Sequence, residues 1–505
     1  MSIFWDFQQV ALRQPGAPAI VMLDSVVSYS AVLGLAENIA GGLLRAGLRR
    51  GDRVAVHIGN RPELVSVYYG CLCVGAVIVP VSTRLSGEEV EYLIAHSAAR
   101  FYLGDARVPG SWAEVIEHSD AIEQAWMLDS AGGTAKMQPW NDLLTDEAVI
   151  PDGIGPQEFA AIFYTSGTTG RPKGLVTSHA TLGAGLDLAA AHGSGRADAT
   201  YYTINLVNPW GILVLLSCLR RGRPLAMTTT NTPDVVLRML RTHRCGWIGG
   251  APTAFRRLLD EVRHSGGPVP DLTETACVAG GDACPIDLSR EFLETFGTHL
   301  QGVYGMTETG GPAILHPSLD SIDEPSIGWP LPGVETKIDS QPGEAGELLL
   351  RAPSRPVGIW NGTVVALFDR EQWVSTGDIV RRLGDGCLAF VGRKADLIMV
   401  EGYPISPLEL EQALAEHADV AAVVVFGVPD AITGERTVAM VEPRPGRRGD
   451  AAALLEHLSG RIAQYKYPSE ITFVDKLPIL PSGKVGRQRL AAEYTSSIPD
   501  GAGSR

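Results

Sequence analysis

A loop rich in glycine and hydroxyl residues, placed directly after an apolar run, is the feature that most constrains what this chain can fold into. The run Phe159–Tyr164 has the length and composition of a buried strand. The loop residues that favour anion binding in this interpretation are Thr165, Ser166, Gly167, Thr168, Thr169, Gly170, Lys173 and Gly174. Glycines allow close backbone approach, successive N–H groups can cradle an anion, and a lysine adds a fixed charge. The loop therefore predicts polyphosphate binding, although loops of this composition are also often solvated connections.

The stretch before this loop alternates between helix and strand patterns. Helical spacing of apolar residues covers 29–46 and 63–74, and strand-like runs cover 52–58 and 76–81. Alternation of this kind predicts a parallel sheet covered by helices, which is an α/β fold. A chain of 505 residues is too long for one hydrophobic core, so we expect more than one domain.

Charge and composition narrow the possible partners and location. The formal net charge of -15 argues against a nucleic-acid partner, which would favour a basic surface. The most apolar segment, 65–81, is short for a membrane span and contains glycines, so we expect a buried helix that leads into a strand. Seven scattered cysteines and the lack of an apparent signal peptide predict a cytoplasmic protein without structural disulfides.

Four further blocks follow the loop in the chain. Residues 301–311 read Gln-Gly-Val-Tyr-Gly-Met-Thr-Glu-Thr-Gly-Gly, and residues 376–378 read Thr-Gly-Asp. Residues 392–411 begin Gly-Arg-Lys-Ala-Asp, and residues 478–484 read Pro-Ile-Leu-Pro-Ser-Gly-Lys. Together with Tyr164–Gly174, these blocks resemble, in order, the motifs of the adenylate-forming (ANL) superfamily of acyl- and aryl-CoA synthetases, peptide-synthetase adenylation domains and luciferases. The resemblance extends over nearly the whole chain.

The resemblance implies a role for each block. The residues implied to hold the β- and γ-phosphates of ATP are Thr165, Ser166, Gly167, Thr168, Thr169 and Lys173. Those implied to bind the adenine, ribose or phosphate of the nucleotide are Gly281, Tyr304, Gly305, Asp378 and Arg393. The implied catalytic residues are Thr307 at the α-phosphate, Glu308 as a ligand of Mg²⁺, and Lys484 for adenylation. Thr168 is implied as a second metal ligand.

By the same resemblance, an acyl pocket is drawn from the segments 207–211, 252–255, 280–283, 303–305 and 309–314. Its implied residues are Asn208, Trp210, Gly280 and Gly310, and Gly402 would line the tunnel for the thiol. These segments contain no Arg, Lys or His, and Asp282 is their one charged side chain. We therefore expect an apolar monocarboxylic acid as substrate, either aryl or short- to medium-chain acyl.

Two positions depart from the family pattern. Asn208 stands where many CoA synthetases have histidine, and Ala395 stands where the hinge between domains has Asp or Lys. Either Lys394 or Asp396 could take over the hinge, and the sequence leaves that choice open.

The implied architecture is an α/β fold with a large N-terminal domain, 1–394, made of parallel-sheet α/β subdomains and a β-barrel-like subdomain. A small mobile α+β domain, 395–490, is expected to follow. Within it, the apolar pattern predicts a strand over 420–427 and a helix over 450–464. The tail, 491–505, is expected to be frayed.

The implied chemistry has two steps. A carboxylate attacks the α-phosphate of Mg·ATP to give acyl-AMP and pyrophosphate, and a thiol then takes the acyl group and releases AMP. CoA is the expected thiol. Three alternatives stay open: loading of a carrier protein's phosphopantetheine arm, a luciferase-like oxidation of the adenylate, and a non-catalytic nucleotide-binding role.

Overall fold

The computed structural model describes residues 3–110, 112–130, 133–145, 153–165, 172–191, 200–202, 206, 208–282, 284–319, 326–341, 343–400, 403–430, 432–459, 461–478 and 487–497. The chain divides into two compact units. The first unit is Met1–Thr336 with Leu350–Val374, and the second is Lys337–Leu349 with Ser375–Arg505. A large α/β domain and a small C-terminal domain are thus confirmed, while the domain boundary expected after residue 394 stays a prediction.

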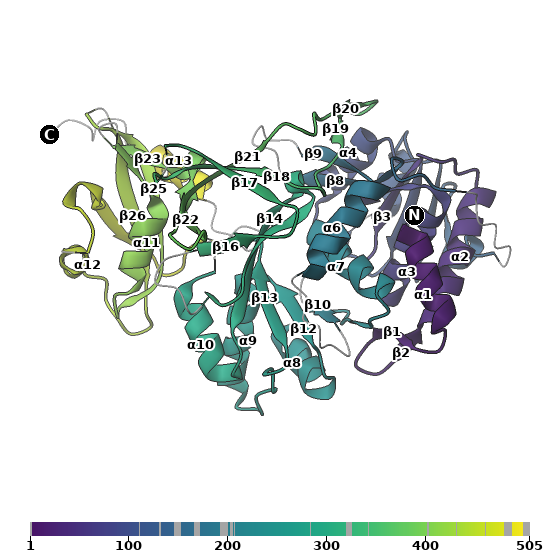
Figure 1. Ribbon diagram of the computed structural model, residues 1–505, viewed down its shortest axis with the longest axis horizontal. Coiled ribbons are helices and arrows are strands. Elements are labelled where there is room, and N and C mark those ends of the chain that lie inside the picture. Colours follow the sequence, from purple (N-terminus) through teal and green to yellow (C-terminus); the bar gives the residue numbers. More distant parts are fainter. Residues whose placement is uncertain are drawn as a thin grey trace. The chain divides into compact units, whose positions relative to one another are not determined.

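One sheet of the first unit contains the strand that precedes the glycine-rich loop. Its strands are β3 (Arg53–His57), β4 (Val77–Pro80), β5 (Phe101–Asp105), β6 (Gln124–Leu128), β7 (Met137–Pro139), β8 (Phe159–Thr165), β9 (Lys173–Ser178), β19 (Gly358–Trp360) and β20 (Val365–Leu367). They are ordered β20-β19-β9-β8-β4-β3-β5-β6-β7 (Figure 1). The strands from β8 to β7 run parallel, and β9, β19 and β20 extend the sheet antiparallel. The strands predicted around 52–58, 76–81 and 159–164 are confirmed.

A second sheet of the first unit carries the other motif-bearing strand, β14. Its strands are β1 (Pro18–Val21), β2 (Val26–Ser28), β10 (Thr200–Tyr202), β11 (Leu225–Ala226), β12 (Trp247–Gly250), β13 (Ala276–Gly280), β14 (Leu300–Met306), β15 (Gly311–His316) and β16 (Ser326–Pro330). Within this unit they are ordered β16-β15-β14-β13-β12-β10-β11-β1-β2. The strands from β14 to β1 are parallel, and β15, β16 and β2 are antiparallel additions.

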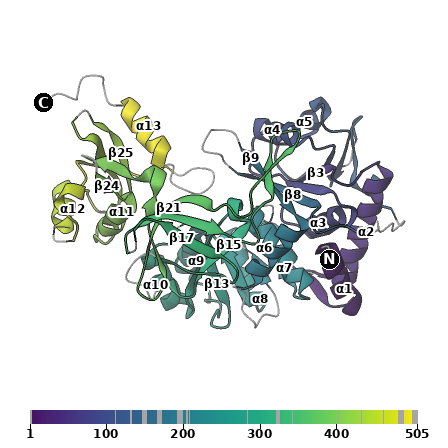
Figure 2. The same cartoon turned by 45° about the horizontal axis from the view of Figure 1, so that its top comes forward.

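Helices cover both faces of each sheet among the described residues (Figures 1 and 2). The helical elements of this unit are α1 (Ile3–Arg13), α2 (Tyr29–Arg45), α3 (Pro62–Val74), α4 (Gly87–Ser97), α5 (Trp112–His118), α6 (His179–Ala191), α7 (Pro209–Arg220), α8 (Pro233–Thr242), α9 (Pro252–Ser265), α10 (Ile286–Phe296), and the 3-10 turns η1 (Trp140–Asp142) and η2 (Thr307–Thr309). Successive strand residues face opposite sides: Val54 joins the core shared with α1, α2, α3, α6 and α7, whereas Ala55 joins the core under α4 and α5. In the second sheet, Val278 joins the shared core and Cys277 the core under α8, α9 and α10.

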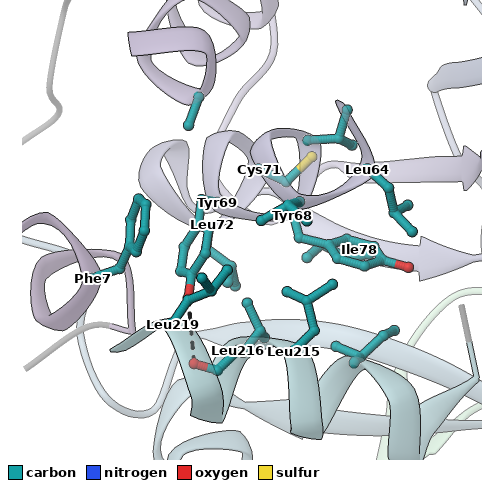
Figure 3. Close-up of a cluster of buried hydrophobic side chains, with 14 of the residues drawn as sticks. Phe7, Leu64, Tyr68, Tyr69, Cys71, Leu72, Ile78, Leu215, Leu216 and Leu219 are labelled. Atoms are coloured by element: carbon teal, nitrogen blue, oxygen red, sulfur yellow. Dashed lines mark hydrogen bonds between the residues drawn. The ribbon is translucent and has the colours of Figure 1, made fainter. Parts of the chain in front are cut away.

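The core between the two sheets explains the most apolar segment of the chain. Helix α3 is buried on nearly all sides, and it leads into the buried strand β4, as the sequence predicted. Figure 3 shows the centre of this core, where the ring of Tyr69 stacks on Phe7 with centroids 3.8 Å apart. The Tyr69 hydroxyl donates to the Leu216 carbonyl of α7 at 3.4 Å, so a buried polar group is paired. This packing fixes α7, which carries pocket residues at its start.

The second unit begins with an antiparallel strip and ends in an α+β fold. Its elements are β17 (Glu335–Asp339), β18 (Gly346–Arg351), β21 (Val374–Arg382), β22 (Leu388–Arg393), η4 (Lys394–Asp396), β23 (Ile398–Val400), β24 (Tyr403–Ile405), α11 (Pro407–Ala415), β25 (Val420–Asp430), β26 (Gly434–Pro443), α12 (Ala451–Leu458), η5 (Gln464–Lys466), β27 (Glu470–Phe473) and α13 (Arg487–Ser497). The strip is ordered β17-β18-β21-β22, and the later sheet β24-β23-β26-β25 with β27 beside β26. One core lies between this later sheet and α11 with α12, and another lies under α13.

Two sequence-based expectations for the second unit need correction. The helix expected over 450–464 ends at Leu458, because the chain turns to an extended conformation at Ser459 and lets Ile462 pack on the same core. Helix α13 continues to Ser497, into the stretch that was expected to be frayed. It is held there because the ring of Tyr494 lies edge-on to Phe426, with centroids 5.6 Å apart.

The structure bears on two expectations from the sequence, which concern disulfides and membrane spans. All seven cysteines are free thiols, and burial raises the pKa of Cys71 and Cys73 to about 12. Among the helices that the structure describes, none combines the length and apolar character that a membrane span requires. The cytoplasmic location stays a prediction.

Candidate functional site

The residues on either side of the glycine-rich loop belong to two paired strands, which form a β-hairpin. Strands β8 and β9 pair antiparallel, with Tyr164 opposite Gly174 and Thr165 opposite Lys173. Lys173, the predicted phosphate-binding cation, is exposed at the start of β9, at the end of the hairpin next to the loop. The remaining predicted loop residues, Ser166, Gly167, Thr168 and Thr169, lie outside the described residues.

The second motif forms a tight corner at the end of β14. After Met306 the chain makes the 3-10 turn η2, and Gly310, with φ at +77°, leads into β15. The Thr309 hydroxyl closes the corner by accepting from the Met306 N–H at 3.3 Å and donating to its carbonyl at 2.9 Å. A Cβ on Gly310 would lie 1.9 Å from a carbonyl oxygen of the neighbouring segment, so the corner requires glycine. Thr307 and Glu308 are therefore held, partly exposed, at the carboxyl end of a parallel strand.

The carboxyl ends of β12, β13 and β14 open onto the same edge of the second sheet, because the three strands are parallel neighbours. Gly280 at the end of β13 pairs with Val303, and Tyr304 and Gly305 follow on β14. A Cβ on Gly280 would lie 2.4 Å from Val303 Cγ1 and 3.3 Å from the ring of Trp210. The structure thus brings together the predicted pocket residues Gly280 and Trp210. Exposed Gly281 follows at once, with φ at +83°.

The start of α7 forms an apolar wall beside these strand ends. The Asn208 side chain caps the helix by accepting from the Gly211 N–H at 2.7 Å. Trp210 then packs edge-on against Trp247 of β12, with centroids 6.1 Å apart and planes at 81°. Asn208 therefore has a structural task where the family has histidine, and its role toward a substrate stays a prediction.

The predicted ribose-binding pair lies in the second unit. Strands β21 and β22 place Asp378 directly opposite Arg393, with Arg393 Nε 3.4 Å from Asp378 Oδ1. The Asp378 side chain is 9% exposed, and its backbone N–H donates to Thr376 Oγ1 at 3.1 Å. A carboxylate held in this way presents acceptor oxygens that suit two ribose hydroxyls. The chemistry of this pair fits the nucleotide that the motif implies.

Both candidates for the hinge are engaged in ion pairs within the second unit. Lys394 Nζ lies 2.9 Å from Glu347 Oε2, and hydrogen bonds from Ser375 and Lys394 lower the pKa of Glu347. Asp396 accepts from Arg487 Nη1 at 2.8 Å. Neither ion pair distinguishes Lys394 from Asp396, so the choice of hinge residue stays open.

Arg487 is a residue that sequence reasoning missed. Besides Asp396, it donates to both Glu411 carboxylate oxygens at 2.7 and 2.9 Å and to the Val425 carbonyl at 2.8 Å. It begins α13 just after the predicted catalytic Lys484, which lies outside the described residues together with Gly402. No local pattern marked it, because the helix sequence around Arg487 is polar and its partners lie far away in the chain.

One predicted metal ligand, Glu308, lies among the described residues. Within the part of the chain that the structure describes, no group of three His, Cys, Asp or Glu side chains could hold a metal ion. Glu308 offers one hard oxygen ligand at the end of β14. This set fits Mg²⁺ bound mainly by ATP phosphates, with Glu308 and the predicted Thr168 completing its shell.

Comparison with known proteins places this geometry in a family. Residues 7–360 match the AMP-binding enzyme family, and residues 409–484 match the AMP-binding enzyme C-terminal domain. The chain belongs to the adenylate-forming (ANL) superfamily of AMP-binding enzymes. It is an AMP-forming acid–CoA ligase, with ATP and a carboxylic acid as substrates.

Relatives of this AMP-forming ligase match along nearly its whole length. A feruloyl-CoA synthase of Amycolatopsis sp is 30% identical, covering 94% of this chain and 95% of the relative. The fatty acid–[acyl-carrier-protein] ligase ScoC of Streptomyces coeruleorubidus is also 30% identical, covering 96% and 95%. The crystal structure of coronafacic acid ligase from Pectobacterium brasiliense is 37% identical, covers 99% of each chain and superposes with a TM-score of 0.85. The acids named for these relatives differ, so membership in the family leaves the substrate open.

Proposed function

We propose that this ligase activates an apolar monocarboxylic acid, either aryl or short- to medium-chain acyl, and transfers it to CoA. The observation that carries this proposal is the composition of the acyl-pocket segments, which contain no Arg, Lys or His. A second carboxylate buried among them would find no cation to pair with, and burying an unpaired charge is costly. Arg256, which directly follows one segment, pairs with Asp287 at 2.8 Å and Glu291 at 2.6 Å, so its charge is already balanced.

The wall beside the strand ends supports an apolar substrate. Trp210 and Val303 close around Gly280, and Leu213 of α7 approaches within 2.4 Å of where a Cβ on Gly311 would lie. These contacts are between carbon surfaces, which favour an aryl ring or an acyl chain over a polar group. The feruloyl-CoA synthase relative acts, by its name, on an aryl acid, which agrees with this class.

For the formation of acyl-AMP, we propose that positive charge is concentrated where the substrate carboxylate meets the phosphates of ATP. Lys173 would hold the β- and γ-phosphates, and Lys484 would lie between the carboxylate and the α-phosphate. Mg²⁺, when bound beside Glu308, would neutralise charge on the leaving pyrophosphate. Thr307 would donate to the α-phosphate, while Asp378 and Arg393 fix the ribose.

A carrier-protein thiol is the second candidate acceptor. The relative ScoC, whose name gives an acyl-carrier protein as acceptor, is as similar to this chain as the feruloyl-CoA synthase. Both acceptors present the same phosphopantetheine thiol, so the residues near that thiol do not separate them. The distinction has to come from turnover.

The test is ATP-dependent pyrophosphate release across a panel of acids, with and without CoA. We expect multiple turnovers with aryl or short- to medium-chain monocarboxylates and CoA, and little release with dicarboxylates of the same size. Faster turnover with a dicarboxylate would contradict the proposed substrate class. Pyrophosphate release could instead stop near one equivalent despite CoA and resume when a phosphopantetheinylated carrier protein is added. That result would show that the carrier protein, and not CoA, is the acceptor.

A matched pair of variants tests the metal ligand. Glu308→Gln should lower pyrophosphate release on the order of 10²–10³, the usual cost of losing one preorganised charge. Glu335→Gln is the control, because the exposed side chain of Glu335 on β17 pairs with Arg351 on β18. Equal loss in both variants would show that the effect of Glu308→Gln comes from the fold and not from metal binding.

A further inference from the structure

Helix α4 contacts the β8–β9 hairpin on both sides of the glycine-rich loop. The Tyr92 hydroxyl donates to the Pro172 carbonyl at 3.1 Å, immediately before Lys173. One helical turn later, His96 Nδ1 lies 2.8 Å from the Tyr164 hydroxyl, immediately before Thr165. The loop that separates Tyr164 from Pro172 is thus bridged at both of its ends by one face of one helix, which lies next to β8 and β9 (Figures 1 and 2).

The end of the hairpin is packed as well as hydrogen-bonded. The rings of His96 and Tyr164 meet edge-on, with centroids 5.7 Å apart and planes at 78°. A Cβ on Gly174 would lie 3.3 Å from Tyr164 Cζ and 3.3 Å from Trp360 Cβ, so the start of β9 runs between these two side chains. This packing helps to fix the register in which Thr165 at the end of β8 lies opposite Lys173 at the start of β9.

Helix α4 is itself anchored at both ends. Ser86 and Glu89 form a reciprocal capping box at its start. At its end, Trp360 Nε1 donates to the His96 carbonyl at 2.7 Å, and Arg53 donates to the Ser97 carbonyl at 3.0 Å. The bonds at its end come from strands β19 and β3 of the sheet that contains the hairpin, so α4 and the hairpin stems form one connected body.

We propose that Tyr92 and His96 are positioning residues that hold the two stems of the glycine-rich loop in the register needed to bind the ATP polyphosphate. This inference rests on the proposed role of that loop. Holding Thr165 and Lys173 in a fixed register before binding lowers the conformational cost of binding, so ATP binds more tightly. The residues act through Tyr164 and Pro172 and do not touch the phosphates.

The chemistry of His96 agrees with positioning rather than with charge. Burial lowers the pKa of His96 below its ordinary value, and burial raises the pKa of Tyr164. Both groups are therefore neutral near pH 7, and neither adds a charge beside Lys173. Loss of the hydrogen bond should consequently change ATP affinity without removing a charge from the site.

The experiment measures KM for ATP and KM for the acid in pyrophosphate release by the full chain. Tyr92→Phe, His96→Phe and Tyr164→Phe each remove one hydrogen-bonding group and keep a ring. Each should raise KM for ATP by roughly three- to tenfold, the effect expected of one hydrogen bond, and leave KM for the acid unchanged. The double variant His96→Phe/Tyr164→Phe should match the single variants, because both remove the same bond. Additive effects, or equal rises in both KM values, would overturn the inference.

Two controls separate this inference from general instability and from the role of the loop. Tyr102→Phe removes a similar buried bond, since the Tyr102 hydroxyl lies 2.7 Å from His57 Nδ1 in the same sheet. It should lower Tm and leave KM for ATP unchanged; a matching rise in KM would show that instability explains the effect. Lys173→Ala tests the loop itself. If Lys173→Ala raises KM for ATP and the α4 variants do not, the inference fails while the proposed function stands; if Lys173→Ala has no effect, the loop role fails.

Discussion

Two arginines, one in each unit, each bind more than one carboxylate: Arg61 is buried, whereas Arg487 is partly exposed, with a side chain 24% exposed. Arg61 donates to both oxygens of Glu63 at 2.8 Å, to Asp105 at 3.2 Å and to Asp129 at 2.9 Å. Its side chain is 8% exposed. The carboxylates lie at the start of α3 and after the ends of β5 and β6, so the cluster ties three connections of the first sheet together.

The second cluster is built around Arg487 in the same way. Arg487 donates two hydrogen bonds to Glu411, one to Asp396 and one to the carbonyl of Val425. The difference is that Arg487 directly follows the motif of Lys484, whereas no adenylation motif adjoins Arg61. The two arginines thus hold similar carboxylate clusters, and we predict that only Arg487 also positions Lys484.

The largest effect should come from Lys484 itself. Lys484→Ala should lower formation of acyl-AMP on the order of 10²–10³, because it removes a charge that stabilises the transition state. Thioester formation from preformed acyl-AMP should be largely spared. Rapid-quench assays of the two half-reactions measure both, and equal loss in both would contradict a role confined to adenylation.

Arg487→Lys should have a smaller effect with the same selectivity. Lysine keeps the charge and loses the planar fork that binds Glu411 and Asp396. We expect roughly a tenfold loss in the adenylation half-reaction, since a poorly placed Lys484 stabilises the transition state less. Thioester formation measured beside it should change little. An unselective loss would place Arg487 with Arg61 as a purely structural residue.

Arg61→Ala should act on stability and not on the ratio of the two half-reactions. Removing one partner of a buried charge cluster leaves carboxylates without compensation and costs about 3–5 kcal/mol of unfolding free energy. Chemical denaturation gives that value directly. A selective fall in adenylation would mean that this cluster also reaches the catalytic site.

Acidification should destabilise the first unit through its buried histidines. Burial lowers the pKa of both His57 and His179 to about 4, below the ordinary value of 6.5. The unfolded chain therefore binds protons first as pH falls, so this stability is full above pH 6.5 and is lost progressively toward about pH 4. Tm measured against pH should flatten over this window in a His57→Gln/His179→Gln variant. If the slope of Tm against pH is unchanged in this variant, the two histidines do not cause the loss of stability in acid.

Much of the fold followed from patterns that are local in the chain. Strand β8, helix α3 and strand β4 were predicted because their apolar residues are consecutive or recur at helical spacing. The meeting of Gly280 and Trp210 was also anticipated, because the family resemblance implied that both belong to one acyl pocket. The length of α12 was not, because the apolar pattern continues to Ile462, which packs on the same core after the chain has left the helix at Ser459.

The contacts that position the site were beyond sequence reasoning. Tyr92 meets Pro172 across 80 residues, and Arg487 meets Asp396 across 91. Tyr92, Arg487 and Asp396 are, taken alone, ordinary polar residues, and Pro172 contributes only its backbone carbonyl. No periodicity pairs them, because their proximity depends on which sheet edge each helix covers.

The sequence by itself determined the family, the two-step chemistry that the motifs imply and the apolar character of the pocket segments. These depend on residue types in a fixed local order, and the resemblance of that order to the family's motifs implied the family and its chemistry. Only the tertiary structure decided which buried charges pair with which, that Asn208 caps a helix, and that α4 bridges the ends of the glycine-rich loop. Those facts arise from long-range packing, where a few ångströms separate a hydrogen bond from no contact at all.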